Sequence, residues 1–261
     1  MGLSESRYIE LQKQFLAVRR SKTNPYKILD YEIYEDRDES PYSGLRLQAV
    51  EEANSGVNEL LNWINHFASI VEDFAAWTEV LEASIDEQER FSTLFEIISP
   101  ISFLALGFPA AIRGKFVFVC ARMIRDTFKV KKRDNSFLDD HLLNEKKLNE
   151  IVKSVTDPPL SIAIQSFVQT LSEIDGKSFR DTTSNYRNRA NHGITPYIEI
   201  GERMAFAPMP GKAVEGFTFG VEKAIKLNAL IDPLIEQHAN CSSSMKAFLP
   251  VVVNFRKLWR I

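Results

Sequence analysis

The chain has 261 residues, of which 44% are hydrophobic and 26% charged, and its formal net charge is −3. These values are ordinary for a globular protein and exclude an overall basic coat for nucleic acid, although a local basic patch stays open. The two cysteines, Cys120 in an apolar run and Cys241 in a Ser-rich segment, are not spaced as a disulfide framework or a metal-ligand motif. The N-terminal segment lacks the apolar run of a secretion signal, so we expect a protein of the reducing cytoplasm.

The first part of the chain is predicted to contain two helices joined by a connector. Residues 6–20 predict an amphipathic helix, and Pro25 to Gly44 a polar, aromatic-rich connector. Over 45–83, apolar residues recur at three- and four-residue steps, which predicts one long helix with a single apolar face. Gly56, with Ser55 as a cap, marks either a bend in this helix or its true start.

The central part is predicted to contain two further helices separated by prolines. The first covers 87–98 and is stopped by Pro100, and the second begins at Pro109, which suits the first position of a helix. The second helix is apolar on nearly all sides, so we expect it at the centre of the fold. The most apolar window, "IISPISFLALGFPAAI", holds two prolines and ends before Arg113, which is short for a membrane span. We therefore expect no membrane segment.

Two more helices are predicted before the pattern changes. One covers 136–155, with Ser136 and Asp139 placed as a capping box. The other begins at Pro158 and ends near Gly176.

Beyond residue 195, short apolar pieces are separated by Gly and Pro. They predict a small β-hairpin or flap over 195–220. Helix is expected again over 221–238, and the end of the chain, 243–261, is compatible with strand or with helix. The predicted fold class is therefore all-α, a multi-helix bundle with one small β-hairpin-like insertion. We expect one domain over 1–261, with a core bundle over 45–240 and the N-terminal helix and C-terminal tail packed on it.

The segment Tyr186 to Gly193, "YRNRANHG", concentrates Arg, Asn and His at the end of a predicted helix. That helix is expected over 178–192, with Ser178 as its N-cap and Gly193 as a left-handed C-terminal cap. Pro196 prevents its continuation. Packing requires only a narrow apolar stripe, so the broad polar face is available to solvent, to a partner or to a ligand.

Three side chains of this helix suit phosphodiester cleavage in RNA. His192, near the negative end of the helix dipole, can take the proton from a 2′-hydroxyl or protonate the leaving 5′-oxygen. Arg187 can bind the scissile phosphate and stabilise the charge that develops on it. Asn188 lies four residues before His192 and so on the same face. Arg187 lies about 140° from His192 around an ideal helix, which favours a site completed by a second copy across a two-fold axis.

This pattern resembles the HEPN superfamily, whose signature is an Arg, four to six residues, and a His. Here Arg187, "NRAN" and His192 give the four-residue spacing, and Asn188 stands where Asn or another polar residue is frequent. The resemblance implies a dimeric helical bundle whose two motifs face one another. It also implies metal-independent endoribonuclease activity in toxin–antitoxin, abortive-infection or other defence systems. Arg187 and His192 would be the catalytic pair with Asn188 in support, and an antitoxin or defence-system protein is a candidate partner.

Other polar side chains are candidates for contacts with RNA. Arg122, Arg125 and Lys129 lie along one helix face that leads into a basic run, and together they can hold RNA phosphates. On the motif helix, Arg189 and Asn191 are further candidates. The alternative for all five is a solvated helix surface with ordinary ion pairs.

His66 and Asp73 belong to a polar stripe on the helix over 45–83, and are auxiliary candidates to approach His192. A solvated helix face is the alternative for both. The sequence contains no zinc or di-iron ligand motif and no phosphate-binding loop, so we expect no metal and no cofactor. The rival to an RNA-cleaving enzyme is a non-catalytic helical module, in which the polar motif helix binds a partner protein, RNA or nucleotide.

Overall fold

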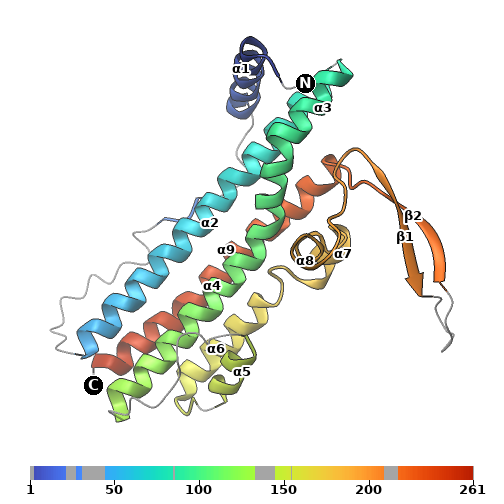
Figure 1. Ribbon diagram of the computed structural model, residues 1–261. Coiled ribbons are helices and arrows are strands. Elements are labelled where there is room, and N and C mark those ends of the chain that lie inside the picture. Colours follow the sequence, from blue (N-terminus) through green and yellow to red (C-terminus); the bar gives the residue numbers. More distant parts are fainter. Residues whose placement is uncertain are drawn as a thin grey trace. The chain divides into compact units, whose positions relative to one another are not determined.

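The computed structural model describes residues 3–21, 28–30, 45–84, 86–132, 145–153, 155–208 and 217–260. It confirms the predicted fold class, an all-α multi-helix bundle with a two-stranded antiparallel hairpin in the described part of the chain (Figure 1). The chain divides into two compact units, which we describe one at a time. Unit 1 comprises the described parts of Met1–Thr23, Val71–Leu106 and Ser178–Leu234, and unit 2 those of Asn24–Ile70, Gly107–Lys177 and Ile235–Ile261. The single domain over 1–261 stays a prediction.

The helices are α1 (Glu5–Ser21), α2 (Leu45–Ala83), α3 (Glu87–Thr93), the π-helical turn η2 (Leu94–Ile98), α4 (Ser99–Lys132), α5 (Glu145–Val152), α6 (Pro158–Leu171), α7 (Lys177–Thr182), α8 (Tyr186–His192) and α9 (Asn228–Arg260). The strands are β1 (Glu202–Pro208) and β2 (Phe217–Lys223). Helices α1, α2 and α6 confirm three of the predicted helices. Most of the connector predicted from Pro25 to Gly44 lies outside the described residues, as do Ser136 and Asp139 of the predicted capping box.

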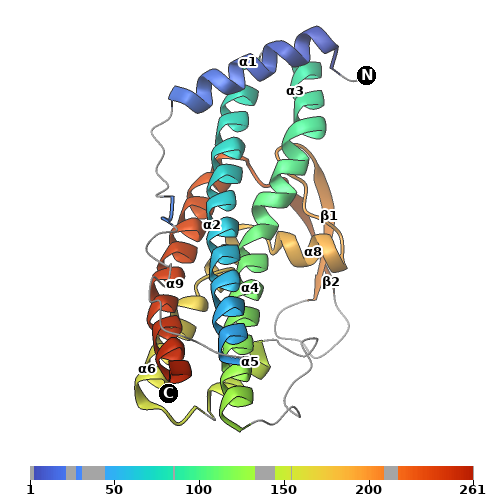
Figure 2. The same cartoon turned by 90° about the vertical axis from the view of Figure 1, so that its left-hand side faces the viewer.

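In unit 1, helix α1 lies across the end of α2 and the start of α3 (Figure 2). The ring of Phe15 stacks on Trp77 with 4.7 Å between the ring centroids. Arg7 binds Glu89 of α3 through two nitrogens, one of them 2.9 Å from its acceptor oxygen. An apolar contact and a charge-assisted pair thus hold α1 at two points along its length.

In unit 2, aromatic side chains from three helices form the centre of the core. Phe116 of α4, Phe167 of α6 and Phe248 of α9 are fully buried, and the ring of Phe167 lies 5.5 Å from Phe116 and 4.9 Å from Phe248. Burying each such side chain contributes about 1.5–3 kcal/mol. Trp259, also buried, donates from Nε1 to Thr127 Oγ1 at 2.9 Å. These contacts explain why the chain end, which the sequence left open between strand and helix, continues as helix α9.

Both boundaries of the helix predicted over 221–238 are wrong. Strand β2 runs to Lys223, and helix α9 begins only at Asn228 and continues to Arg260. The hairpin predicted over 195–220 is confirmed by β1 and β2, and its tip, residues 209–216, lies outside the described residues.

The predicted helix break between Pro100 and Pro109 is also wrong, because α3, η2 and α4 follow one another without a gap and Pro109 lies inside α4. In the π-helical turn, the Ser99 N–H donates to the Leu94 carbonyl five residues earlier. This wider turn tolerates Pro100, which has no N–H to donate. An interior proline costs about 3 kcal/mol, which the apolar side chains that α4 buries offset.

Because this helix is continuous, Glu87–Thr127 is by length and composition alone long and apolar enough to cross a membrane. The length argument against a membrane span therefore does not hold. A core helix of a soluble protein meets the same criterion, so the absence of a membrane segment stays a prediction.

Helix α2 continues through Gly56, so the prediction that this glycine begins the helix with Ser55 as its cap is wrong. A Cβ atom on Gly56 would lie 2.8 Å from Cγ1 of Val119 in α4. Glycine is required at this position because the two helices approach closely.

We expect Gly56→Ala to destabilise the protein by about 1 kcal/mol. Overpacking costs about 1–3 kcal/mol, and the higher helix propensity of Ala offsets about 1 kcal/mol of that cost. Val119 is branched at Cβ and strongly prefers one side-chain rotamer in a helix, so turning its methyl groups away costs energy. A Cβ atom on Gly114 of α4 would meet no side chain within 4 Å, and Gly114→Ala is expected to stabilise by up to about 1 kcal/mol. Urea unfolding measures both variants, and equal stabilisation by the two substitutions would contradict the close contact.

His238 of α9 is a buried titratable group in unit 2. Its side chain is 4% exposed, and its ring lies 6.3 Å from that of Phe67 between centroids. Burial lowers the pKa of His238 to about 4. An unfolded histidine has a pKa of about 6.5, so the folded state binds the proton less well. The stability that neutral His238 contributes is therefore complete above about pH 6.5 and is lost as the pH falls towards 4.

We expect His238→Leu to remove this acid sensitivity. Between pH 7 and pH 4, the wild type should lose about 3 kcal/mol more of its free energy of unfolding than the variant. Urea unfolding of both proteins at pH 7, 5.5 and 4 measures the difference. Parallel curves for the two proteins would show that His238 does not couple folding to protonation.

Candidate active site

The motif helix predicted over 178–192 is interrupted, because the structure has two short helices, α7 and α8, in its place (Figure 1). Between them Ser184 (φ 51°) and Asn185 (φ 52°) adopt the left-handed conformation. The Asn185 N–H donates to the Arg180 carbonyl at 2.6 Å and closes the turn. Serine and asparagine favour such turns over helix interiors because their side chains compete for backbone hydrogen bonds. The break lets α8 take a direction of its own.

The predicted caps of the motif helix are wrong as well. Ser178 lies inside α7, which begins one residue earlier. Gly193 is extended, with φ −155°, and is not a left-handed cap. Its N–H still donates to the Arg189 carbonyl at 2.9 Å, so the last turn of α8 is closed by an ordinary backbone hydrogen bond.

The exposed and the less exposed side chains of helix α8 lie on two different faces. With 100° between successive residues, one arc of about 140° carries the exposed side chains, which are Arg187, Asn188, Asn191 and His192. The remaining arc carries the less exposed ones, which are Tyr186, Arg189 and Ala190. Tyr186 is buried, and burial raises the pKa of its hydroxyl. The predicted catalytic residues thus lie together on the exposed arc of one short helix.

Arg189 anchors α8 within unit 1. Its guanidinium forms a two-pronged ion pair with Glu222 of β2, with Nη2 2.8 Å from Oε2 and Nη1 bound to Oε1. It also donates to the carbonyl of Ser184 before α8, at 3.4 Å, and to that of Ile194 after it, at 3.3 Å. The sequence made Arg189 a candidate for RNA contacts. In the structure, this guanidinium instead binds Glu222 and two backbone carbonyls of the protein.

The hairpin presents Glu222 to α8 because strand side chains alternate between the two faces. Val221, next to Glu222, pairs across the hairpin with Met204, so these two side chains share the opposite face. They are 57% and 64% exposed. The hairpin therefore joins the motif helix through Glu222 and exposes the apolar pair Met204 and Val221 on its other face.

The predicted basic face on α4 is not formed as expected. Arg125 is 5% exposed and donates from Nε to Asp126 at 3.0 Å, so it offers no exposed guanidinium to RNA, contrary to the prediction. Arg122 is partly exposed and pairs with Glu52 of α2 at 2.9 Å. Lys129 lies in α4, and its side chain is outside the described part of the structure.

The auxiliary candidates on α2 make contacts of their own. In unit 1, Oδ1 of Asp73 lies 2.9 Å from Nε of Arg19 on α1, so its carboxylate is engaged. In unit 2, the ring of His66 lies nearly perpendicular to that of Phe108, with 5.4 Å between the ring centroids. Their approach to His192 stays a prediction.

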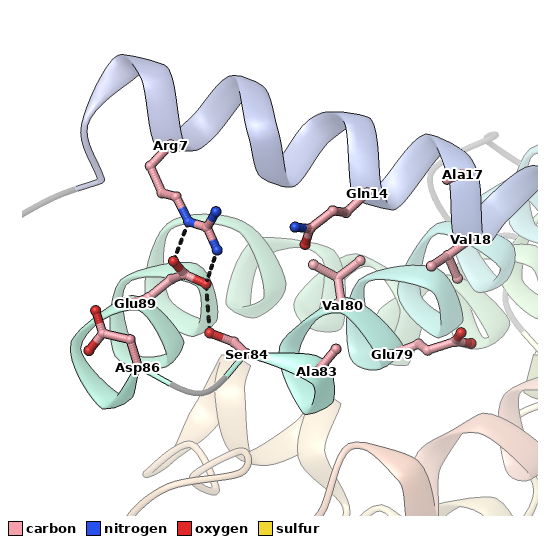
Figure 3. A pocket seen from close by; sticks show the side chains of 10 residues that line it. All are labelled: Arg7, Gln14, Ala17, Val18, Glu79, Val80, Ala83, Ser84, Asp86 and Glu89. Carbon is pink, nitrogen blue, oxygen red and sulfur yellow. Dashed lines mark hydrogen bonds and ion pairs between the residues drawn. The ribbon is translucent and has the colours of Figure 1, made fainter.

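A cavity of about 520 Å³ lies in unit 1, between α1, the end of α2 and the start of α3 (Figure 3). Glu89 accepts hydrogen bonds from Arg7 and from Ser84, whose Oγ lies 2.6 Å from it. The polar groups at this end of the cavity therefore satisfy one another. The residues that line the cavity include none from α8, so it is separate from the motif.

Within the described ranges, no group of three or more His, Cys, Asp or Glu side chains is placed to hold a metal ion. No protein-family model, no curated protein and no solved structure matches the chain. The resemblance to the HEPN superfamily is therefore carried by the motif spacing and by the helical fold class, and it stays a prediction.

Proposed function

We propose that the chain is a metal-independent endoribonuclease of the HEPN type that cleaves RNA through attack of a 2′-hydroxyl on the adjacent phosphate. One observation carries the proposal, the sorting of side chains on α8. On one side of the helix, Tyr186 is buried and Arg189 pairs with Glu222, and on the other side Arg187, Asn188 and His192 are all exposed on one arc. A helix end kept only for packing does not require that arrangement.

The proposed reaction exchanges one P–O bond for another. The 2′-oxygen bonds to phosphorus as its proton passes to a base, and the bond to the 5′-oxygen breaks as that oxygen receives a proton. The products are a 2′,3′-cyclic phosphate and a 5′-hydroxyl. His192 transfers the protons, and Arg187 stabilises the charge on the phosphate oxygens. Asn188 orients the side chain of either His192 or Arg187.

A single His192 can act as base or as acid at one moment, and the reaction needs both. Two copies related by a two-fold axis would supply two histidines and two arginines to one phosphate, which is why we propose a homodimer. The proposed setting is the cytoplasm, in defence, stress response or a toxin–antitoxin system, with RNA as substrate and an antitoxin or defence-system protein as a further partner.

The experiment is incubation of labelled single-stranded RNA with purified protein in EDTA, followed by identification of the new ends. We expect 2′,3′-cyclic phosphate and 5′-hydroxyl termini, because the mechanism uses the adjacent 2′-hydroxyl and needs no metal. Replacing the 2′-hydroxyl at each cleaved position by hydrogen is the matched substrate control and should prevent cleavage there. Ends with 5′-phosphate, or activity that EDTA abolishes, would contradict the proposal.

A second candidate is the non-catalytic module, favoured by an exposed apolar pair on the hairpin. Met204 and Val221 expose more than half of their surfaces beside each other on one of its faces. Such a pair suits a protein partner. Wild-type protein that cleaves no RNA and retains a folded α8 would favour this candidate.

A further inference from the structure

The segment that leaves α8 carries a half-exposed aromatic ring that lies against the chain's own backbone. Tyr197 stands five residues after His192 and is 50% exposed. Its ring lies against the backbone of Gly201, because a Cβ on Gly201 would be 3.0 Å from both Cγ and Cδ2 of the ring. Gly201 has φ +117°, a conformation that favours glycine. Glycine thus allows both the turn and the placement of the ring.

The backbone around this ring is tied to the segment that follows the hairpin. Three backbone hydrogen bonds of 2.8–3.1 Å join the stretch 197–201 to residues 224–225. Glu199 adds two more links, one to the Leu227 N–H at 3.1 Å and one to Lys226 Nζ at 3.2 Å. A ring on so constrained a backbone loses little conformational entropy when a flat ligand stacks on it.

The position of the ring relates it to the motif. Five residues of chain span at most about 18 Å between Cα atoms, so Tyr197 lies within reach of nucleotides that flank a phosphate held at His192. Bases in an A-form duplex are stacked on one another, whereas unpaired bases can stack on exposed aromatic side chains.

We propose that Tyr197 is a stacking platform for an unpaired base next to the scissile phosphate, which makes single-stranded RNA the substrate class. The inference rests on the proposed function. The ring binds a base of the RNA and takes no part in the proton transfers, which His192 carries out. Tyr197 therefore contributes to RNA binding and to the choice of cleavage position.

The test measures RNA affinity without cleavage, by anisotropy of a labelled, unstructured oligonucleotide bound to protein carrying His192→Ala. Adding Tyr197→Leu should raise the Kd about tenfold or more, because stacking on one aromatic ring is worth about that much. Tyr197→Phe keeps the ring and should restore the affinity. The matched control is Tyr8→Leu, which removes a tyrosine of α1 that is 44% exposed, and its Kd should stay within about twofold.

An abasic nucleotide walked along the oligonucleotide identifies the stacked base. At one position, the loss of affinity caused by the abasic nucleotide should disappear in Tyr197→Leu protein, because the ring and the base form one contact.

If Tyr197→Leu leaves the affinity for RNA unchanged, the inference is wrong. The ring, with exposed Ile194 and Ile200, is then assigned to a protein contact. If the EDTA assay shows cleavage and Tyr197→Leu is silent, only the stacking inference fails. If cleavage is absent and binding depends on Tyr197, the stacking stands and the catalytic proposal fails.

Discussion

Replacing His192 by Ala is expected to lower the rate of RNA cleavage about 10²–10⁴-fold, the usual cost of removing a positioned general acid or base. The side chain is exposed at the end of α8, so the free energy of unfolding should change by less than about 0.5 kcal/mol. Arg187→Ala should give a loss of similar size, and Arg187→Lys an intermediate one, because Lys keeps the charge and loses the two-pronged contact. Initial rates in EDTA, together with urea unfolding, measure both quantities.

The matched control is Arg20→Ala, which removes an exposed arginine near the end of α1 and should leave the cleavage rate unchanged. A loss of rate in His192→Ala that is matched by a loss of stability would indicate a structural role. Full activity in both motif variants would contradict the proposed site.

Mixing wild-type protein with His192→Ala protein tests the two-fold assembly. If one phosphate needs the histidines of both copies, a dimer with one copy of each kind is inactive. After subunit exchange with an equal amount of the variant, the wild-type activity should fall to about half, because only half of the wild-type copies still pair with one another. If each copy acts alone, the variant leaves the activity unchanged.

The helices that could be predicted are those in which local pattern and tertiary packing agree. Over 45–83, the apolar spacing alone gives the bounds of α2. The helix break predicted at Pro100 and Pro109 is wrong because the free-energy cost of a proline inside a helix is offset here. A π-helical turn and the burial of side chains along α4 offset that cost, and neither can be recognised from the sequence around the prolines. The chain end was left open because Phe255 and Trp259 reveal their packing only once their partners are in place.

The motif residues could be found from the sequence, and the way α8 is held could not. Ser184 and Asn185 are residues that tolerate the left-handed conformation, yet nothing local requires them to adopt it. Glu222 stands 33 residues beyond Arg189, and an ion pair between elements so far apart has no sequence signature. Arg189 was therefore grouped with the RNA-binding candidates, since sequence alone does not separate an arginine that holds a helix from one that binds a phosphate.

Removing the anchor of α8 should reduce both stability and activity. Arg189→Ala leaves Glu222 and the carbonyls of Ser184 and Ile194 without their shared donor. The side chains of the ion pair are each 24% exposed, so we expect a loss of about 1–3 kcal/mol in the free energy of unfolding. Cleavage should fall about 10–100-fold, because small displacements of catalytic groups are costly. Faster hydrogen exchange in α8 would show that the helix has loosened.

The matched control for the ion pair is Glu145→Gln, which breaks the pair of Arg113 with a carboxylate that is 48% exposed. That change should cost less than about 1 kcal/mol and leave cleavage intact.

Glu222→Gln distinguishes an anchoring arginine from an RNA-binding one, because the two roles predict effects of opposite sign. If Arg189 binds RNA and Glu222 merely competes for it, removing the negative charge should lower the KM for RNA and steepen its salt dependence. If Arg189 holds α8, the same substitution should lower kcat, with little change in the salt dependence of KM. We expect the second result, because Arg189 also binds the two carbonyls that flank α8, contacts that an arginine reserved for RNA has no need to make.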